Sequence, residues 1–218
     1  MSIPSDTGRG GRLLRGEGSA VLPILRALPP SAFDQPTLLP GWSVRDVLAH
    51  CSAALKMAST LQFHDFSPAS NEKDVEHRRG WPVEQLLDEL APGYEAAAAA
   101  IDAAAGRLDA LALGEWVHGG DVRDALGLPA AYASEGLADA LVLLAERSRG
   151  KTPGTDVTLT TIAPEPSPTL RLGPEDQTPA ATLVTDPATL IRLCAGRSPD
   201  PSQFTLTGAQ PVDYLLFA

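Results

Sequence analysis

The sequence predicts an α+β protein in which a bundle of four or five helices is followed by a small α+β domain. Up to about Arg149, apolar residues recur with the i, i+3, i+4, i+7 spacing of amphipathic helices. From about Asp156 onward, short runs of β-branched residues alternate with polar ones, which is typical of strands. Between these regions, Gly150–Gly154 has the composition of a linker. We therefore expect a flexible tail over residues 1–18, the helical bundle over 19–150 and the small domain over 151–218.

The composition narrows the class of protein. The 218 residues are 44% hydrophobic, enough for an ordinary globular core, and their net charge is −10. Nucleic acids and anionic membrane surfaces attract proteins rich in Lys and Arg, so neither is an expected partner. No stretch reaches the roughly 18 apolar residues of a membrane-spanning helix, and the N-terminus lacks the apolar block of a secretory signal. The two distant cysteines, Cys51 and Cys194, favour a reducing compartment. We expect a cytoplasmic protein, and the sequence leaves open whether it is a monomer or a small homo-oligomer.

Local signals place the first two helices. A helix over Ala20–Leu28 ends at a pair of prolines. The next helix begins after Ser43, because Asp46 follows three residues later and completes a capping box. Its apolar positions define one buried stripe and are Val44, Val47, Leu48, Cys51, Leu55 and Ala58.

Further helices follow from similar signals. One begins near Pro82, a favoured first-turn residue, and runs to about Ala105, with Pro92 expected to kink or split it. Another covers roughly Leu108–Leu126, and the last covers about Ser134–Arg149. The short connections between them favour a bundle.

The expected small domain combines strands with one short helix. It would have about 65 residues and bury only a thin core by itself, so we expect it to pack on the bundle. The helix covers Ala188–Ala195, and Val212–Phe217 forms a final helical turn. The strands are Val157–Ile162, Thr169–Leu172, Ala181–Thr185 and Gln203–Thr207.

Polar side chains stand on the expected buried faces of two helices. His50 lies at the edge of the stripe that begins at Val44; one interpretation is a core-edge histidine bonded to a backbone carbonyl. Glu115 and His118 occupy positions of the Leu108–Leu126 helix where apolar residues are expected, and Asp121 lies at the margin of that face. Burying such groups without partners costs several kcal/mol. These residues therefore need a structural or functional explanation.

Two interpretations of this group stay open. A glutamate and a histidine one turn apart, facing a histidine on another helix, is a way in which bundles build metal sites, and such a ligand set leaves coordination positions open for catalysis. Alternatively, Glu115 and His118 form a buried ion pair that only holds helices together. Gly119 and Gly120 follow directly and weaken a helix by roughly 1 kcal/mol each. They indicate close approach of a backbone or a ligand, or else a simple irregularity of the helix.

The remaining histidines and motifs carry less information. We expect His64 and His77 to be solvated residues of the loop between the second and third helices. A zinc-dependent redox sensor that uses Cys51 beside His50 is disfavoured, since adjacent helical residues point roughly 100° apart. The sequence has no Gly-rich phosphate loop, GxSxG elbow or CxxC pair. Nucleotide hydrolysis, α/β-hydrolase chemistry and thioredoxin-type exchange therefore lack support.

A family resemblance rests on segments from both parts of the chain. Leu39–His50 reads LPGWSVRDVLAH, and Glu115–Gly127 reads EWVHGGDVRDALG. Near the C-terminus, Val184–Arg197 is followed by Phe204–Gly208. Together these segments resemble the two signatures and the small C-terminal domain of the mycothiol-dependent maleylpyruvate isomerase family, a branch of the DinB-like four-helix metalloproteins. The resemblance spans nearly the whole chain beyond the tail and implies a DinB-like bundle followed by a small α+β domain.

The resemblance implies a metal site with one departure from the family pattern. It makes His50 and His118 metal ligands. The family places a carboxylate ligand four residues before the second histidine, where this chain has Gly114. Glu115 would point roughly 100° away from that direction, and Asp121 lies angularly closer to it. Either residue is a candidate third ligand, and a weak or absent metal is the alternative.

The chemistry follows from the same resemblance. It implies a divalent metal such as zinc and mycothiol as the thiol cosubstrate; a metal-bound thiol loses its proton at neutral pH. The sulfur would then attack a small electrophile, which gives isomerisation or S-transfer. Arg197 is the candidate cation for the negative charge that develops on the substrate, although a role at the end of its helix is as well supported. The alternative function is a metal-free family member that binds a small molecule or serves an accessory role.

Overall fold

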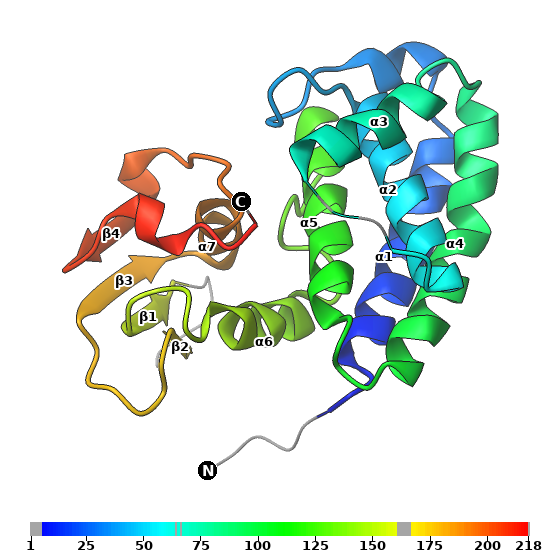
Figure 1. The fold of residues 1–218 in the computed structure, drawn as a ribbon. Helices are drawn as coiled ribbons and strands as arrows, with labels where there is room; N and C mark the ends of the chain where they lie inside the picture. The colour runs from blue at the N-terminus through cyan, green and yellow to red at the C-terminus, as the bar shows by residue number, and fades with distance from the viewer. Residues whose placement is uncertain (1–5, 64, 66, 161–166, 218) are drawn as a thin grey trace. The chain divides into compact units, whose positions relative to one another are not determined.

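The computed structural model describes residues 6–63, 65, 67–160 and 167–217. It divides into two compact units, Met1–Asp139 and Ala140–Ala218. The first unit is helical and the second contains the sheet (Figure 1). The order confirms the expected α+β class, a helical bundle followed by a small α+β region. The division falls inside α6 (Leu137–Ser148), earlier in the chain than the expected linker at Gly150–Gly154.

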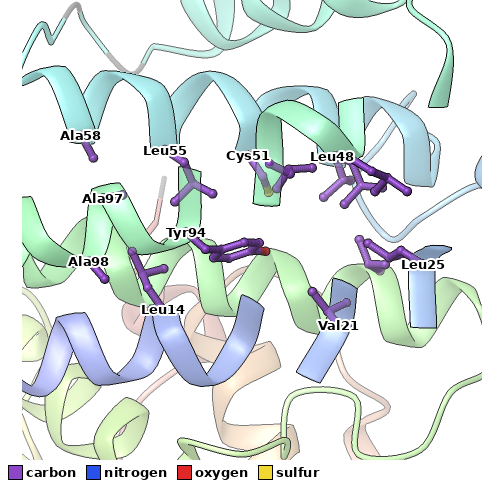
Figure 2. Packing of buried hydrophobic residues seen from close by; sticks show 14 of the residues in the cluster. Leu14, Val21, Leu25, Leu48, Cys51, Leu55, Ala58, Tyr94, Ala97 and Ala98 are labelled. Atoms are coloured by element: carbon purple, nitrogen blue, oxygen red, sulfur yellow. The ribbon is translucent and has the colours of Figure 1, made fainter. Parts of the chain in front are cut away.

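Four helices form the bundle of the first unit. They are α1 (Arg9–Arg26), α2 (Val44–Thr60), α4 (Val83–Ala103) and α5 (Asp109–Ala125), and they run alongside one another in Figure 1. A short 3-10 helix, η1 (Pro30–Asp34), lies between α1 and α2. Figure 2 shows the packing between the helices, where Tyr94 of α4 lies among apolar side chains of α1 and α2. The other labelled members of this hydrophobic cluster are Leu14, Val21, Leu25, Leu48, Cys51, Leu55, Ala58, Ala97 and Ala98.

The first helix begins earlier than the sequence indicates. We expect a flexible tail up to Gly18, yet α1 starts at Arg9, and Leu13 and Leu14 are almost fully buried. The glycines in this segment permit close helix packing: a Cβ on Gly11 would overlap the Asp102 carboxylate of α4. The glycines suggested a flexible tail, but in this segment they allow α1 to pack closely against α4.

The second helix begins as expected. The Ser43 hydroxyl accepts a hydrogen bond from the Asp46 backbone N–H at 3.3 Å, and the Asp46 carboxylate accepts one from the Ser43 N–H at 2.9 Å. This reciprocal capping box satisfies two backbone donors that a helix start leaves without partners. It fixes where α2 begins and therefore which of its faces carries His50.

The region between α2 and α5 differs from expectation in one feature, and it decides between two alternatives for another. Residues expected as a loop contain a further helix, α3 (Pro68–Arg78), which Ser67 caps and on which His77 lies exposed. Its apolar content is low, so helical periodicity did not reveal it. The other expected loop histidine, His64, lies outside the described residues. The following helix, α4, is not split at Pro92 and runs through it.

The second unit is built on a four-stranded sheet. The strand order is β2-β1-β3-β4, with β1 and β3 parallel and the outer pairs antiparallel. A single helix, α7 (Pro187–Cys194), connects β3 to β4, and η2 (Pro201–Gln203) and η3 (Pro211–Tyr214) are short 3-10 turns. The strands are β1 (Thr155–Leu159), β2 (Thr169–Leu172), β3 (Ala181–Thr185) and β4 (Phe204–Thr207).

The strands follow their sequence pattern closely. Side chains of β3 alternate between buried and exposed positions, as expected for a strand with one face on a core. The first strand begins and ends before the expected Val157–Ile162, and Thr161 and Ile162 lie outside the described residues. None of the described helices is both long and apolar enough to cross a membrane.

Candidate functional site

The structure brings His50 of α2 and His118 of α5 into edge contact. Their ring centroids are 5.0 Å apart and the rings are nearly perpendicular, at 83°. Two imidazoles bound to one ion through bonds of about 2.1 Å, at an angle near tetrahedral, place their centroids about 5 Å apart. The spacing between the two rings therefore suits a shared ligand.

His50 has a buried nitrogen without a partner. Only 6% of the residue is exposed, and Nδ1 has no hydrogen-bond partner among the described residues. The expected core-edge interpretation, a bond to a backbone carbonyl, is not seen at this atom. Burial, and after it the neighbouring His118, lower the pKa of His50 to about 3. The ring is therefore neutral near pH 7 and keeps a lone pair for a ligand.

His118 lies against a buried carboxylate. Its Nδ1 is 3.0 Å from Oδ2 of Asp121, one turn further along α5. The other carboxylate oxygen, Oδ1, accepts a hydrogen bond of 2.7 Å from the Tyr132 hydroxyl. Asp121 and Tyr132 are both fully buried. Asp121 thus touches the second histidine and a tyrosine that the sequence did not single out.

Glu115 faces a different neighbour. It is 3% exposed, is hydrogen-bonded to the Cys51 thiol, and has one oxygen, Oε2, without a hydrogen-bond partner among the described residues. Burial raises the pKa of Glu115 to about 7, although the nearby His118 and the Cys51 hydrogen bond oppose this. In the described part of the chain, the carboxylate paired with His118 belongs to Asp121 rather than Glu115.

The paired glycines of α5 are explained by two side chains. A Cβ on Gly119 would overlap the carboxylate of Glu17, which forms a buried ion pair with Arg123. A Cβ on Gly120 would overlap the ring of Tyr132. The close approach indicated by the sequence is therefore real, and side chains, rather than a backbone or a ligand, make these contacts.

The site fits a metal ion only in part. The neutral His50, the unpartnered Nδ1 and the spacing of the two rings suit a divalent cation. A third ligand is not in place: the described residues contain no group of three or more His, Cys, Asp or Glu side chains arranged to hold a metal. At Gly114, where the resemblance implies a carboxylate, an added Cβ would meet nothing within 4 Å.

Arg197, the candidate cation, belongs to the second unit. It follows the end of α7, where its guanidinium donates to the Ala195 carbonyl and its backbone N–H donates to the Arg192 carbonyl at 2.9 Å. The residue is half-buried. These local contacts suit the helix-end interpretation and leave the substrate-binding role a prediction.

Sequence reasoning missed Glu17 and Tyr132. Glu17 lies in the segment expected to be a tail, although it is fully buried and paired with Arg123. Tyr132 lies in an irregular connection, where no periodicity marks a buried position. The available signal was the Gly119–Gly120 pair, since adjacent glycines inside a helix indicate that bulky groups pack against it.

The fold and the site define a helical bundle in which two neighbouring helices each present a histidine to the other. The family model for the mycothiol maleylpyruvate isomerase N-terminal domain matches residues 14–135, more than half of the chain, and the chain belongs to this family.

Solved structures support the same fold. The crystal structure of the mycothiol-dependent maleylpyruvate isomerase is 18% identical, with a TM-score of 0.55, and the match covers 96% of this chain and 95% of that one. A histidine-to-alanine mutant of that isomerase is 17% identical over the same shares of both chains, also with a TM-score of 0.55. Among curated proteins, no sequence matches this chain.

Proposed function

We propose that the chain is an enzyme that uses an external thiol of the mycothiol type to isomerise a small electrophile or to transfer the thiol to it. The observation that carries this proposal is the contact between His50 and His118, which stand in the two family signatures. The thiol and the reaction class come from the family and from the mycothiol-dependent isomerase of similar fold. The two histidines supply the place where the thiol would be bound and activated.

We propose that His50 and His118 hold a divalent metal, with zinc the expected ion. When bound, such a metal lowers the pKa of a coordinated thiol, so that the thiolate is present at neutral pH. The protein's own residues prepare the site: burial keeps His50 neutral, and Asp121 contacts Nδ1 of the His118 ring. The unpartnered oxygen of Glu115 makes it the candidate third ligand, and loss of its proton near pH 7 would be required.

The reacting thiol has to come from outside the chain. The chain has two cysteines, and both are buried. Burial raises the pKa of Cys194 to about 12 and, with Glu115, raises the pKa of Cys51 well above its usual range. Neither is a ready nucleophile, because the thiolate is the reactive form. Free cysteines also agree with the reducing cytoplasm that we propose as the location.

We further propose that Arg197 binds a carboxylate of the substrate. A guanidinium offers a planar fork of donors that matches a carboxylate. If this is correct, Arg197→Lys will raise the KM for a carboxylate-bearing substrate and Arg197→Ala will raise it further, while metal content stays unchanged. An unchanged KM in both variants would assign Arg197 to the end of α7 only.

The proposal is tested by replacing the metal with cobalt. Cobalt-loaded protein is titrated with mycothiol, and we expect a thiolate-to-cobalt charge-transfer absorption that S-methylated mycothiol does not produce. His50→Ala and His118→Ala should lose this absorption, while His77→Ala, which changes an exposed histidine of α3, should keep it. Absence of the absorption in the unaltered protein would contradict thiol activation at this site.

A second candidate function is metal-free binding of a small molecule. It is favoured by Gly114 at the position of the family's carboxylate and by the absence of a three-ligand group among the described residues. Chelation separates the two functions. Removing divalent ions should abolish mycothiol binding if the enzyme proposal is correct, whereas a metal-free binding protein would keep its affinity for its ligand.

A further inference from the structure

The segment between α5 and α6 carries Tyr132 into the interior of the bundle. Ala130 and Tyr132 both adopt left-handed backbone conformations, each with a φ of 58°. Residues other than glycine rarely adopt this conformation, and such residues persist where surrounding contacts hold them. Here the Tyr132 side chain is fully buried, and the Trp116 indole N–H donates to the Glu135 carbonyl at 3.0 Å, which ties the same segment to α5.

The surface of α5 is shaped to receive this tyrosine. Gly120 lies under the ring, and any larger residue there would overlap it. With the ring in this place, the hydroxyl reaches Oδ1 of Asp121 at 2.7 Å, while Oδ2 of the same carboxylate lies 3.0 Å from Nδ1 of His118. The segment that carries Tyr132, the glycine at position 120 and the buried carboxylate of Asp121 thus meet beside His118.

We propose that Asp121 and Tyr132 are positioning residues that keep the His118 proton on Nδ1. The Tyr132 hydroxyl donates to Oδ1. An Nδ1–H on His118 would donate to Oδ2, because a carboxylate oxygen accepts hydrogen bonds. The lone pair of the imidazole then resides on Nε2, the nitrogen on the side of the ring away from Asp121. A carboxylate behind a ligating histidine fixes both the tautomer and the orientation of the ring.

This assignment changes the role expected for Asp121. The resemblance made it a rival metal ligand in place of the missing carboxylate, whereas its two oxygens contact His118 and Tyr132. Asp121 therefore acts through His118 rather than on a bound ion. The proposed function enters this inference at one point, the identity of the ion that Nε2 would bind. The tautomer of His118 does not depend on it, because the tautomer is a property of the metal-free protein.

The direct test is the nitrogen NMR spectrum of the histidine rings in chelator-treated protein. In the unaltered chain we expect His118 to carry its proton on Nδ1. Asp121→Ala and Asp121→Asn should both reduce the fraction of this tautomer. The Nε2–H form in the unaltered protein, or an unchanged Nδ1–H form in both variants, would overturn the proposal.

Zinc affinity of the same proteins gives an independent measurement. We expect Asp121→Ala to weaken zinc binding by about 10- to 100-fold, the usual effect of losing such a partner, and Tyr132→Phe to weaken it several-fold. Tyr214→Phe is the matched control, because it removes a buried hydroxyl that is 2.8 Å from Thr155 in the other unit, and it should bind zinc as the unaltered protein does.

The two measurements separate the inference from the proposed function. If the unaltered protein binds no zinc but carries His118 as the Nδ1–H tautomer through Asp121, the metal-dependent function fails and the positioning role holds. If zinc binds and neither Asp121 variant changes the tautomer or the affinity, the positioning role fails and the proposed function stands.

Discussion

The three glycines in the middle of α5 stand in three different environments. Gly114 has open space around the direction of its missing side chain, Gly119 faces the Glu17 carboxylate, and Gly120 faces the Tyr132 ring. A sequence shows only that each weakens a helix. Whether a glycine is dispensable depends on what packs against it, and that requires the positions of residues far away in the chain.

Substitution by alanine should separate these environments. Gly119→Ala should lower the free energy of unfolding by about 1–3 kcal/mol, because the ion pair of Glu17 with Arg123 is buried and has no room to shift. Gly114→Ala should raise it by roughly 0.5–1 kcal/mol through better helix propensity. Urea unfolding of both variants provides the measurement, and equal effects would contradict the packing described for α5.

The buried Glu115 makes stability depend on pH in the metal-free protein. Its pKa is raised from 4.5 to about 7, so between these values the unfolded chain has lost a proton that the folded chain retains. Stability therefore falls as the pH rises through this window, by about 3 kcal/mol in total. Glu115→Gln removes the ionisation and should exceed the unaltered protein in stability at pH 8 while nearly matching it at pH 4.

The control for this prediction is an exposed glutamate. Glu76→Gln on α3 should leave the pH dependence of chemical unfolding as it is in the unaltered protein. If Glu115→Gln also leaves it unchanged, the carboxyl group is already ionised in the folded protein at pH 5, and its burial is less complete than described.

At the scale of elements, α2 and α5 were predictable, whereas the start of α1 and the whole of α3 were not. The capping box at Ser43 and the apolar stripe of α2 are local signals, and the structure follows them. The start of α1 depends on glycines that pack against α4, and α3 is a polar helix held by contacts such as the ion pair between Arg78 and Glu89. Both depend on partners that local periodicity does not reveal.

The capping box gives a prediction for α2. Ser43→Ala removes the side chain that accepts from the Asp46 N–H, and it should cost about 1 kcal/mol in the free energy of unfolding. Ser59→Ala in the same helix removes only an exposed hydroxyl bonded to the Lys56 carbonyl and should cost less than about 0.5 kcal/mol. Comparable losses at both positions would contradict a special role for the cap.

The arrangement of residues on the faces of α5 gives a second prediction at the scale of elements. Position 114 lies one turn before His118, and residues four apart share a helix face. Gly114→Glu therefore places a carboxylate on the His118 face, in space that the chain leaves open. We expect zinc affinity to rise at least about tenfold, or about 1.4 kcal/mol, with a smaller gain for Gly114→Gln. No gain in either variant would contradict the placement of the metal beside His118.

For the whole molecule, the order of structural classes was predictable and the division between units was not. The segment Gly150–Gly154 reads as a linker, yet it belongs to the second unit, where Ser148 accepts a hydrogen bond of 2.8 Å from the Gly173 N–H and Thr152 is buried. At the candidate site, the sequence drew attention to both histidines, because His50 stands at the edge of one apolar stripe and His118 interrupts another, and the structure brings their rings into contact. It did not reveal Tyr132, which lies in the irregular segment between α5 and α6.

The burial of both cysteines predicts the behaviour of the whole chain toward thiol reagents. The folded protein should react with neither Cys51 nor Cys194 under conditions in which a small exposed thiol reacts fully, and both should react in denaturant. Ellman's reagent measures this directly. Rapid reaction of Cys51 in the folded protein would contradict the packing around Glu115 and would make an internal thiol available to the chemistry.

Zinc stoichiometry is the most direct test of the central claim that His50 and His118 share one ion. After exposure to zinc and removal of loosely bound metal by gel filtration, elemental analysis should find about one zinc per chain, as two converging imidazoles with an added donor predict. His50→Ala and His118→Ala should each lose it, and His77→Ala should retain it. A chain that keeps no zinc, or that keeps it in both histidine variants, would contradict the account.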